Sequence, residues 1–520
     1  MNATSLKACI LVITVAIVVF AIGKPLFMRF ISAEDFARRR NLWLLLVSAS
    51  FLAPNIWLYI LVAVPAIVIA TSRDSNPAAL YLFVLLAVPP VRVEIPTLGL
   101  VGQVFAIDHP RLLSIALLLP VAFTLRQKNH LEAATQRAPG SPSSAWSLID
   151  ALLVSFVVLQ VVLILPYDSF TSLARRAVLL GLDILLPYFV ISRLCRTRGR
   201  ITEAMAAFVL AMVVLTPLAI YEFFRGWMIF AIVGEDWNAG HMYFPLYRGP
   251  FLRAQATAGH SIFLGYFMAM ALGMWLYLQR AVPLQKGWRW LCSLGLLAGL
   301  IVSLSRGPWV GAAAMLVTFL VLGPNARSRS LRGAALAAAV VGALVLSPWG
   351  SDVAQYLPFV GSIDEHTVVY RQQLAMASWS LIQQNPFFGS FSFLKNLEEF
   401  RTGEGIIDLV NTYAIVGLTY GLVGVALFVS VFLAAMWKMT RLVRQLAATD
   451  ADVASLGSAM VACVAGTLLI LATTSFLHSM PYFVWAFVGF ADAYVRSVSE
   501  ELGTDRLVRT VGDAYPQVVR

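Results

Sequence analysis

The stretch Ser303-Leu304-Ser305-Arg306-Gly307-Pro308-Trp309 joins two apolar runs, residues 291–302 and 310–322. An arginine this close to hydrocarbon depth costs several kcal/mol unless a partner or an aqueous cavity receives it. We expect Gly307 and Pro308 to loosen the helix, and irregular backbone at membrane depth is tolerated where it lines a cavity. Arg306 is therefore predicted to be a buried anion-binding group. The alternative is an interfacial arginine that extends to the lipid headgroups.

The whole chain is strongly apolar. Of its 520 residues, 59% are hydrophobic and only 12% are charged, whereas a soluble protein carries about 25% charged residues. Apolar runs of roughly 17–25 residues, the length of a membrane-spanning helix, recur along it. Because these runs are continuous and do not alternate, the sequence predicts an all-α polytopic integral membrane protein and excludes a transmembrane β-barrel.

The net charge of +11 follows the same pattern, because basic residues gather in short loops between apolar runs. This is the positive-inside arrangement of a membrane protein and not a nucleic-acid interface. The four cysteines lie in or beside apolar runs without the spacing of a disulfide framework or metal site. We expect no metal, no cofactor and no nucleic-acid partner.

The basic clusters also predict the topology, since an even number of helices separates successive clusters. The count is about 13 to 15 spans. The number of helices is open in residues 41–125, where Pro54-Asn55 indicates either two short helices or one kinked helix. The later spans are predicted at 147–166, 174–192, 201–222, 259–279, 290–304, 308–323, 333–347, 412–437, 455–475 and 479–495.

This topology divides the chain into five parts. They are N-terminal transmembrane helices (1–200), core helices with an outer aromatic and arginine-rich segment at 223–259 (201–346), one large periplasmic loop (347–410), C-terminal helices (411–497) and a poorly ordered cytoplasmic tail (498–520). Loops as long as 347–410 are uncommon unless they are functional or disordered. Within this loop, residues 372–384 have an amphipathic helical pattern that ends at Asn385-Pro386, and Arg371 opens it. An ion pair of Arg371 with Asp364 or Glu365 is the alternative role for that arginine.

Three arginines, Arg253, Arg306 and Arg371, fall on the predicted outer face. Arginine stays protonated, so it cannot be a general base. It binds phosphate well through a planar, bidentate fork. A membrane enzyme with such arginines would be suited to a lipid-linked pyrophosphate substrate. The arginines would hold the diphosphate and stabilise the negative charge that builds up on it as it leaves.

Several short motifs occur in a specific order along residues 250–440. They are Ser305-Arg306-Gly307, Tyr370-Arg371 at the opening of the long loop, Asn385-Pro386-x-x-Gly389, and Asn411-Thr412-Tyr413. Together they resemble the bacterial O-antigen ligase and O-antigen polymerase superfamily. The first 200 residues resemble it only in being hydrophobic spans.

The resemblance implies a multi-pass glycan transferase of the bacterial inner membrane with a periplasmic active face. Such enzymes take a saccharide from undecaprenyl pyrophosphate and pass it to a growing glycan, to lipid A–core or to protein, without a metal. Their implied partners are donor, acceptor and membrane lipids, with a polysaccharide flippase and a chain-length regulator. Arg306 and Arg371 match the family's functional arginines, and Arg253 matches a third position more weakly.

One position departs from the family. Ligases carry a histidine immediately before the asparagine of the post-loop motif, but this chain has Val410 there. Asp408 is the first substitute for the missing base, and Glu404 is the second. The alternative for both, which their loop position favours, is a solvated acid without a catalytic role. The remaining candidates are the histidines His241, His260 and His366.

These considerations give a candidate site and a ranking of functions. The predicted catalytic residues are Arg306, Arg371 and Asp408, and the predicted substrate-binding residues are Arg253, Arg248, His260 and Asn411. The missing ligase histidine favours a polymerase of lipid-linked repeat units over a ligase to lipid A–core. The alternative from a different functional class is a transporter or flippase of lipid-linked glycan. Symmetry between the two halves of the chain would indicate such a protein. A membrane scaffold is the last alternative.

Overall fold

The computed structural model describes residues 3–96, 103–135, 146–238, 244–323, 365–401 and 407–514. Helices dominate these ranges, which confirms the predicted all-α class. The two small additions are antiparallel pairs of strands. In the first, β1 (Val93–Pro96) pairs with β2 (Gln103–Ile107), and in the second, β3 (Tyr247–Arg248) pairs with β4 (Phe251–Leu252).

The described ranges contain the following α-helices. In chain order they are α1 (Ala3–Phe27), α2 (Ala33–Leu52), α3 (Ile56–Arg73), α4 (Pro77–Val84), α5 (His109–Leu113), α6 (Leu119–Thr135), α7 (Leu148–Val162), α8 (Phe170–Leu180), α9 (Leu186–Leu194), α10 (Arg198–Arg225), α11 (Ala231–Asp236), α12 (Ser261–Ala281), α13 (Lys286–Val302), α14 (Arg306–Leu322), α17 (Glu365–Gln384), α18 (Thr412–Leu446), α19 (Ala451–Leu471) and α20 (Met480–Ala514). Single π-helical turns join α5 to α6 (Ser114–Leu118) and α8 to α9 (Gly181–Leu185).

Seven helices in the described ranges are long and apolar enough to cross a membrane. They are Ala3–Phe27, Ile56–Arg73, Phe170–Leu194, Arg198–Arg225, Ser261–Ala281, Thr412–Leu446 and Ala451–Leu471, and α7 and α14 are shorter apolar helices. This composition confirms an integral membrane protein. The larger count of spans stays a prediction, and its span at 333–347 lies outside the described residues.

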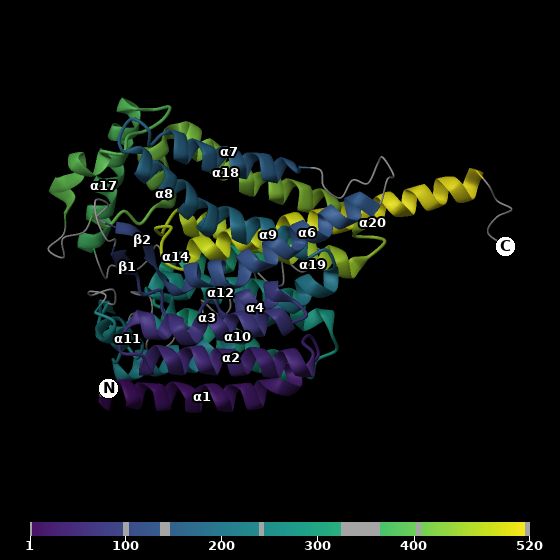
Figure 1. The fold of residues 1–520 in the computed structure, drawn as a ribbon, viewed down its shortest axis with the longest axis horizontal. Coiled ribbons are helices and arrows are strands. Elements are labelled where there is room, and N and C mark those ends of the chain that lie inside the picture. Colours follow the sequence, from purple (N-terminus) through teal and green to yellow (C-terminus); the bar gives the residue numbers. More distant parts are fainter. Residues whose placement is uncertain are drawn as a thin grey trace, which may run out of the picture.

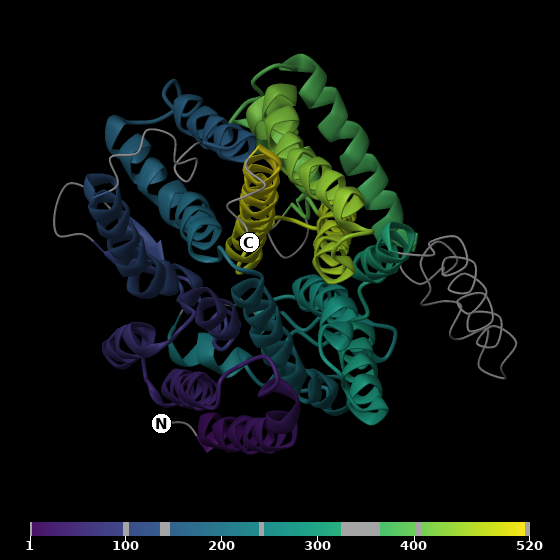
Figure 2. The ribbon, with the colours of Figure 1, turned by 90° about the vertical axis from the view of Figure 1, so that its right-hand side faces the viewer.

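The helices run side by side, with α11, α17, β1 and β2 at one end of the molecule and the C-terminal part of α20 at the other (Figure 1). We call the first of these the α17 end. Viewed end-on, α20 lies near the middle of the helices (Figure 2), where it packs against α9, α18 and α10. Helix α12 is the most deeply buried of the seven long apolar helices, followed by α10 and α19.

Two breaks between helices differ in how well the sequence predicted them. At Pro54-Asn55 the first of the two alternatives holds, because α2 and α3 are separate and the Asn55 side chain accepts a hydrogen bond from the Leu58 amide at 3.0 Å. The prediction that Gly307 and Pro308 loosen the helix was wrong. They lie in the first turn of α14, where proline removes an amide that has no partner within the helix. The irregular residue is Leu304, with φ of +45°.

Two predicted helix boundaries were also wrong. Helix α17 begins at Glu365, so Arg371 lies within the helix and does not open it. Helix α20 continues to Ala514, so residues 498–514 are helical and not a poorly ordered tail. No proline interrupts the chain there before Pro516, so nothing ends the helix at the point where its polar composition begins.

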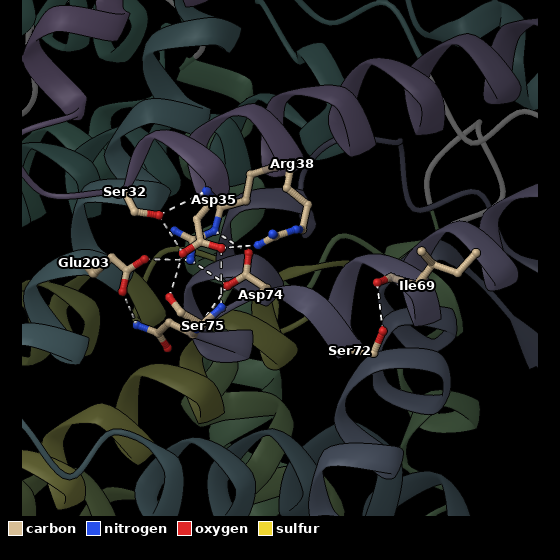
Figure 3. A network of polar contacts seen from close by, with 10 residues as sticks. Ser32, Asp35, Arg38, Ile69, Ser72, Asp74, Ser75 and Glu203 are labelled. Atoms are coloured by element: carbon tan, nitrogen blue, oxygen red, sulfur yellow. Dashed lines mark hydrogen bonds and ion pairs between the residues drawn. The ribbon is translucent and has the colours of Figure 1, made fainter.

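A buried ion-pair network ties α2, α10 and the residues after α3 together at the end opposite α17 (Figure 3). The guanidinium of Arg39 binds Asp74 through two bonds of 2.9 and 2.7 Å and Glu203 through a third of 2.7 Å. The side chains of Arg39 and Asp74 are 1% and 0% exposed. A buried charge of this kind requires its partners, because their loss leaves an uncompensated ion.

We expect Arg39→Ala to destabilise the fold by about 3–5 kcal/mol, because it leaves the buried carboxylate of Asp74 without its partner. The measurement is the thermal midpoint of the detergent-solubilised protein. Arg401→Ala is the matched control, since Arg401 pairs with Glu398 at a site where both side chains are about half exposed. Equal midpoints for the two variants would contradict the role of this network.

Candidate functional site

A buried carboxylate organises the α17 end of α10. Glu222 accepts backbone hydrogen bonds from Ile229 at 3.0 Å, from Gln255 at 3.0 Å and from Ala256 at 2.7 Å. A carboxylate can be buried when it accepts several such bonds. It therefore folds the segment between α10 and α12 back over the end of α10. The sequence analysis missed Glu222, although an acid inside an apolar run is itself a signal.

That segment delivers two of the predicted arginines to the turn between α13 and α14. Arg248 donates to the carbonyl of Leu304 at 2.7 Å. Arg253 donates to the hydroxyl of Ser305 at 2.9 Å and, more weakly, to the carbonyl of Ser303 at 3.4 Å. Carbonyl groups at the C-terminus of a helix favour such cations. The two arginines thus hold the turn that precedes Arg306.

Arg306 is the first residue of α14 and is partly buried. The Ser305 hydroxyl donates to the Ser303 carbonyl at 3.0 Å and accepts from Arg253, so it does not cap α14. The amide groups of a helix's first turn, together with its dipole, favour an anion. Gly307 fits closely here, since a Cβ on it would lie 2.0 Å from the Thr473 hydroxyl oxygen.

The Asn385-Pro386-x-x-Gly389 motif has a structural explanation, because it docks α17 against a kink in α18. Gly389 and Gly421 both have positive φ, +64° and +67°. A Cβ on Gly421 would lie 2.2 Å from the Phe387 carbonyl oxygen. The Leu422 amide donates to the Pro386 carbonyl at 2.7 Å. Only glycine allows this approach of two backbones.

Arg371 and Asp408, both predicted catalytic residues, lie close together. Their charged groups are 3.8 Å apart, and both side chains are about two-fifths exposed. Tyr370 fixes this arrangement, because its hydroxyl accepts from the Asp408 amide at 3.3 Å and donates to the Phe400 carbonyl at 2.7 Å. The alternative partners expected for Arg371, Asp364 and the Glu365 side chain, lie outside the described part of the structure.

His260 connects these groups. It caps the N-terminus of α12, where its Nδ1 accepts from the Ile262 amide at 3.1 Å, so the ring proton lies on Nε2. The pKa of His260 is lowered to about 3, mainly by burial, and the positive charges of Arg253 and Arg371 contribute to this shift. These two arginines precede and follow α14 in the chain.

Two further residues of this site were missed by the sequence analysis. Phe263 packs between two imidazoles, with its ring centroid 5.5 Å from His260 and 5.3 Å from His478. Burial lowers the pKa of His478 to about 4, and the charge of Arg92 contributes. Arg92 directly precedes β1, so the first third of the chain reaches the site. His478 was detectable as the histidine of the short outer turn between the spans predicted at 455–475 and 479–495.

The remaining predicted residues have mainly structural contacts or cannot be placed. The side chain of Asn411 caps α18 by accepting from the Ala414 amide at 3.1 Å. Glu404 and His241 lie outside the described residues, as does the side chain of His366. The structure thus gathers Arg253, Arg306, Arg371, Asp408 and His260 at the α17 end, with Arg248 supporting the turn.

Residues 291–429 match the family model described as O-antigen ligase. The match confirms the resemblance to the O-antigen ligase and polymerase superfamily. Members of this family are glycan-transferring enzymes, and residues 291–429 of this integral membrane protein are similar to them. A comparison with curated proteins found no match.

The matched O-antigen ligase domain runs from α13 into α18. It includes Arg306, Arg371 and Asp408. Arg253, His260 and His478 lie outside the matched residues. Three-dimensional contacts, and not the family match, associate these residues with the domain.

We expect Glu222→Gln to destabilise the protein by about 2–3 kcal/mol, because its amide nitrogen would face backbone donors in place of an oxygen. The measurement is the thermal midpoint in detergent. Glu235→Gln is the control, since Glu235 is exposed in the same segment. A Glu222→Gln variant as stable as this control would show that the carboxylate does not anchor the segment.

We expect the stability of the protein to fall as the pH is lowered from about 6.5 towards 4, because unfolded histidine binds a proton in this range. Folded His260, with a pKa of about 3, stays neutral there, and so the unfolded state gains protons that the folded state does not. His260→Asn keeps an N-capping side chain and should flatten this dependence. The measurement is the thermal midpoint against pH for both proteins; identical profiles would contradict the prediction.

Proposed function

We propose that this protein is an inner-membrane glycan transferase whose α17 end faces the periplasm. It joins saccharide units carried on undecaprenyl pyrophosphate, as a polymerase of O-antigen or exopolysaccharide repeat units. The observation that carries the proposal is the turn before α14, which Arg248 and Arg253 hold directly in front of Arg306 at the N-terminus of that helix. The match to the O-antigen ligase family supports it. The basic loops would then face the cytoplasm.

In this proposal the arginines bind the diphosphate of the donor. Arg306, at the N-terminus of α14, and Arg371, on α17, hold the phosphate oxygens, and Arg253 adds charge from the side of the turn. The acceptor hydroxyl attacks the anomeric carbon, and the bond from this carbon to the diphosphate oxygen breaks. The electron pair leaves with the diphosphate, where preorganised cations stabilise it more strongly in the transition state than in the bound donor.

The other predicted residues support this arrangement. Asp408 orients the guanidinium of Arg371, Arg248 holds the turn before Arg306, and Asn411 fixes the start of α18. His260, at the N-terminus of α12, contributes its Nε2 proton as a donor to bound substrate. Asp408 was also the first substitute predicted for the missing ligase histidine, and Asp408→Asn tests that role directly.

A ligase that transfers glycan to lipid A–core is the second candidate, since the matched family is described by that activity. Val410 favours the polymerase, because the family's ligases have a histidine at that position and valine cannot transfer a proton. A flippase and a chain-length regulator would be the functional neighbours in either pathway. A transporter of lipid-linked glycan is the alternative in which the protein is not a transferase.

The test is the surface polysaccharide profile of a deletion strain. Single repeat units that become long chains on complementation indicate a polymerase. Long chains that accumulate on the lipid carrier indicate a ligase. An unchanged profile would contradict both and favour a transporter.

We expect Arg306→Ala and Arg371→Ala to lower the transfer rate by about 10²–10³-fold, because each removes a cation that stabilises the leaving diphosphate. The measurement is glycan transfer by the purified variants, together with complementation of the deletion strain. Arg401→Ala, an exposed arginine paired with Glu398 in the same loop, is the control. Normal complementation by a properly inserted Arg306→Ala protein would remove that residue from the mechanism.

A further inference from the structure

The turn between α19 and α20, residues 472–479, is attached to both sides of Val410. The hydroxyl of Ser475 donates to the Leu409 carbonyl at 2.8 Å, and the hydroxyl of Thr412 donates to the Thr474 carbonyl at 2.7 Å. These two bonds hold the turn beside the segment that lacks the ligase histidine. The turn itself carries a histidine, His478.

The same turn reaches two other parts of the site. Thr473 packs against Gly307, the residue that follows Arg306. At its other end, the Cγ of His478 lies 3.7 Å from the place where a Cβ on Gly259 would be, directly before His260. One turn therefore contacts the start of α14, the residues around Val410 and the start of α12.

The backbone holds His478 in an unusual conformation. Its φ of +54° lies in the left-handed region, which few residues other than glycine adopt, and such strain gathers at functional sites. The neighbouring Leu477 is 56% exposed, whereas the imidazole of His478 is partly buried against Phe263. The strained turn thus directs a polar ring inward and leaves a leucine outside.

We propose that His478 is a catalytic residue and accepts the proton of the acceptor hydroxyl. The inference rests on the proposed glycan transfer and names its base. As the acceptor oxygen bonds to the anomeric carbon, its proton moves to a free imidazole nitrogen of His478. The anomeric carbon releases the diphosphate with its electron pair, and the imidazolium then returns its proton to water or to the released diphosphate.

The other candidate bases are less suitable for this step. Nδ1 of His260 is already bonded to the Ile262 amide, and the ring is surrounded by the charges of Arg253 and Arg371. Asp408 lies against Arg371, which the proposed reaction needs for the diphosphate. His478 is neutral at pH 7, because burial and Arg92 lower its pKa to about 4, so it has a nitrogen that can accept a proton. A diphosphate bound nearby would oppose the effect of Arg92 and strengthen the base.

The experiment measures release of undecaprenyl diphosphate from lipid-linked glycan purified from the deletion strain. We expect His478→Asn to lower kcat by about 10²–10⁴-fold with an unchanged KM for this donor. Asparagine tolerates a positive φ, so the variant should fold. His478→Gly keeps the turn and leaves a space, and added imidazole should restore part of its activity. Leu477→Ala, in the same turn and exposed, is the control.

Each outcome separates this inference from the proposed function. Full activity of His478→Asn would overturn the inference, as would a folded His478→Gly protein that imidazole does not rescue. If Asp408→Asn, and not His478→Asn, showed the loss in kcat, Asp408 would be the base. Failure of the wild-type protein to consume the donor would overturn the proposed function together with this inference.

Discussion

The carboxylate of Glu222 is the constraint on which the α17 end of this molecule depends. A charge in an apolar helix is stable only when it is fully hydrogen-bonded, and here the partners are backbone amides of the segment that follows α10. The segment that carries Arg253 and ends at His260 is thereby held over the helix ends. The turn before Arg306 can then be held by side chains that lie about 50 residues earlier in the chain.

Arginine side chains make two kinds of contact in this molecule. At the end opposite α17, Arg39 binds Asp74 and Glu203, and Arg193 and Arg496 bind the buried Asp150, so each cation is matched by carboxylates. At the α17 end, Arg248 and Arg253 donate to carbonyl and hydroxyl groups, which are neutral. Hydrogen bonds to neutral acceptors position a guanidinium without cancelling its charge. Ion pairs of the first kind stabilise the fold, and contacts of the second kind position the turn that leads into Arg306.

Much of the fold was predictable from local pattern. Long apolar runs and basic loops define helices in a membrane, and the pair of alternatives at Pro54-Asn55 was settled by an asparagine cap. The errors occurred where local rules were applied to residues whose role depends on position within a helix. Pro308 begins a helix without disturbing it, and Arg371 lies within a helix that starts six residues earlier, at Glu365.

By itself, the sequence determined the all-α membrane class and the family resemblance confirmed over residues 291–429, and it proposed the arginines of the candidate site. These features depend on composition and on motifs that are contiguous in the chain. Tertiary structure alone associated Arg92, Glu222 and His478 with that site. They come from three separate parts of the chain, and only the packing of α10 against α12 and of α12 and α19 against α14 brings them to the same end of the molecule. Contacts between distant segments depend on how buried surfaces fit together, and no local pattern records this fit.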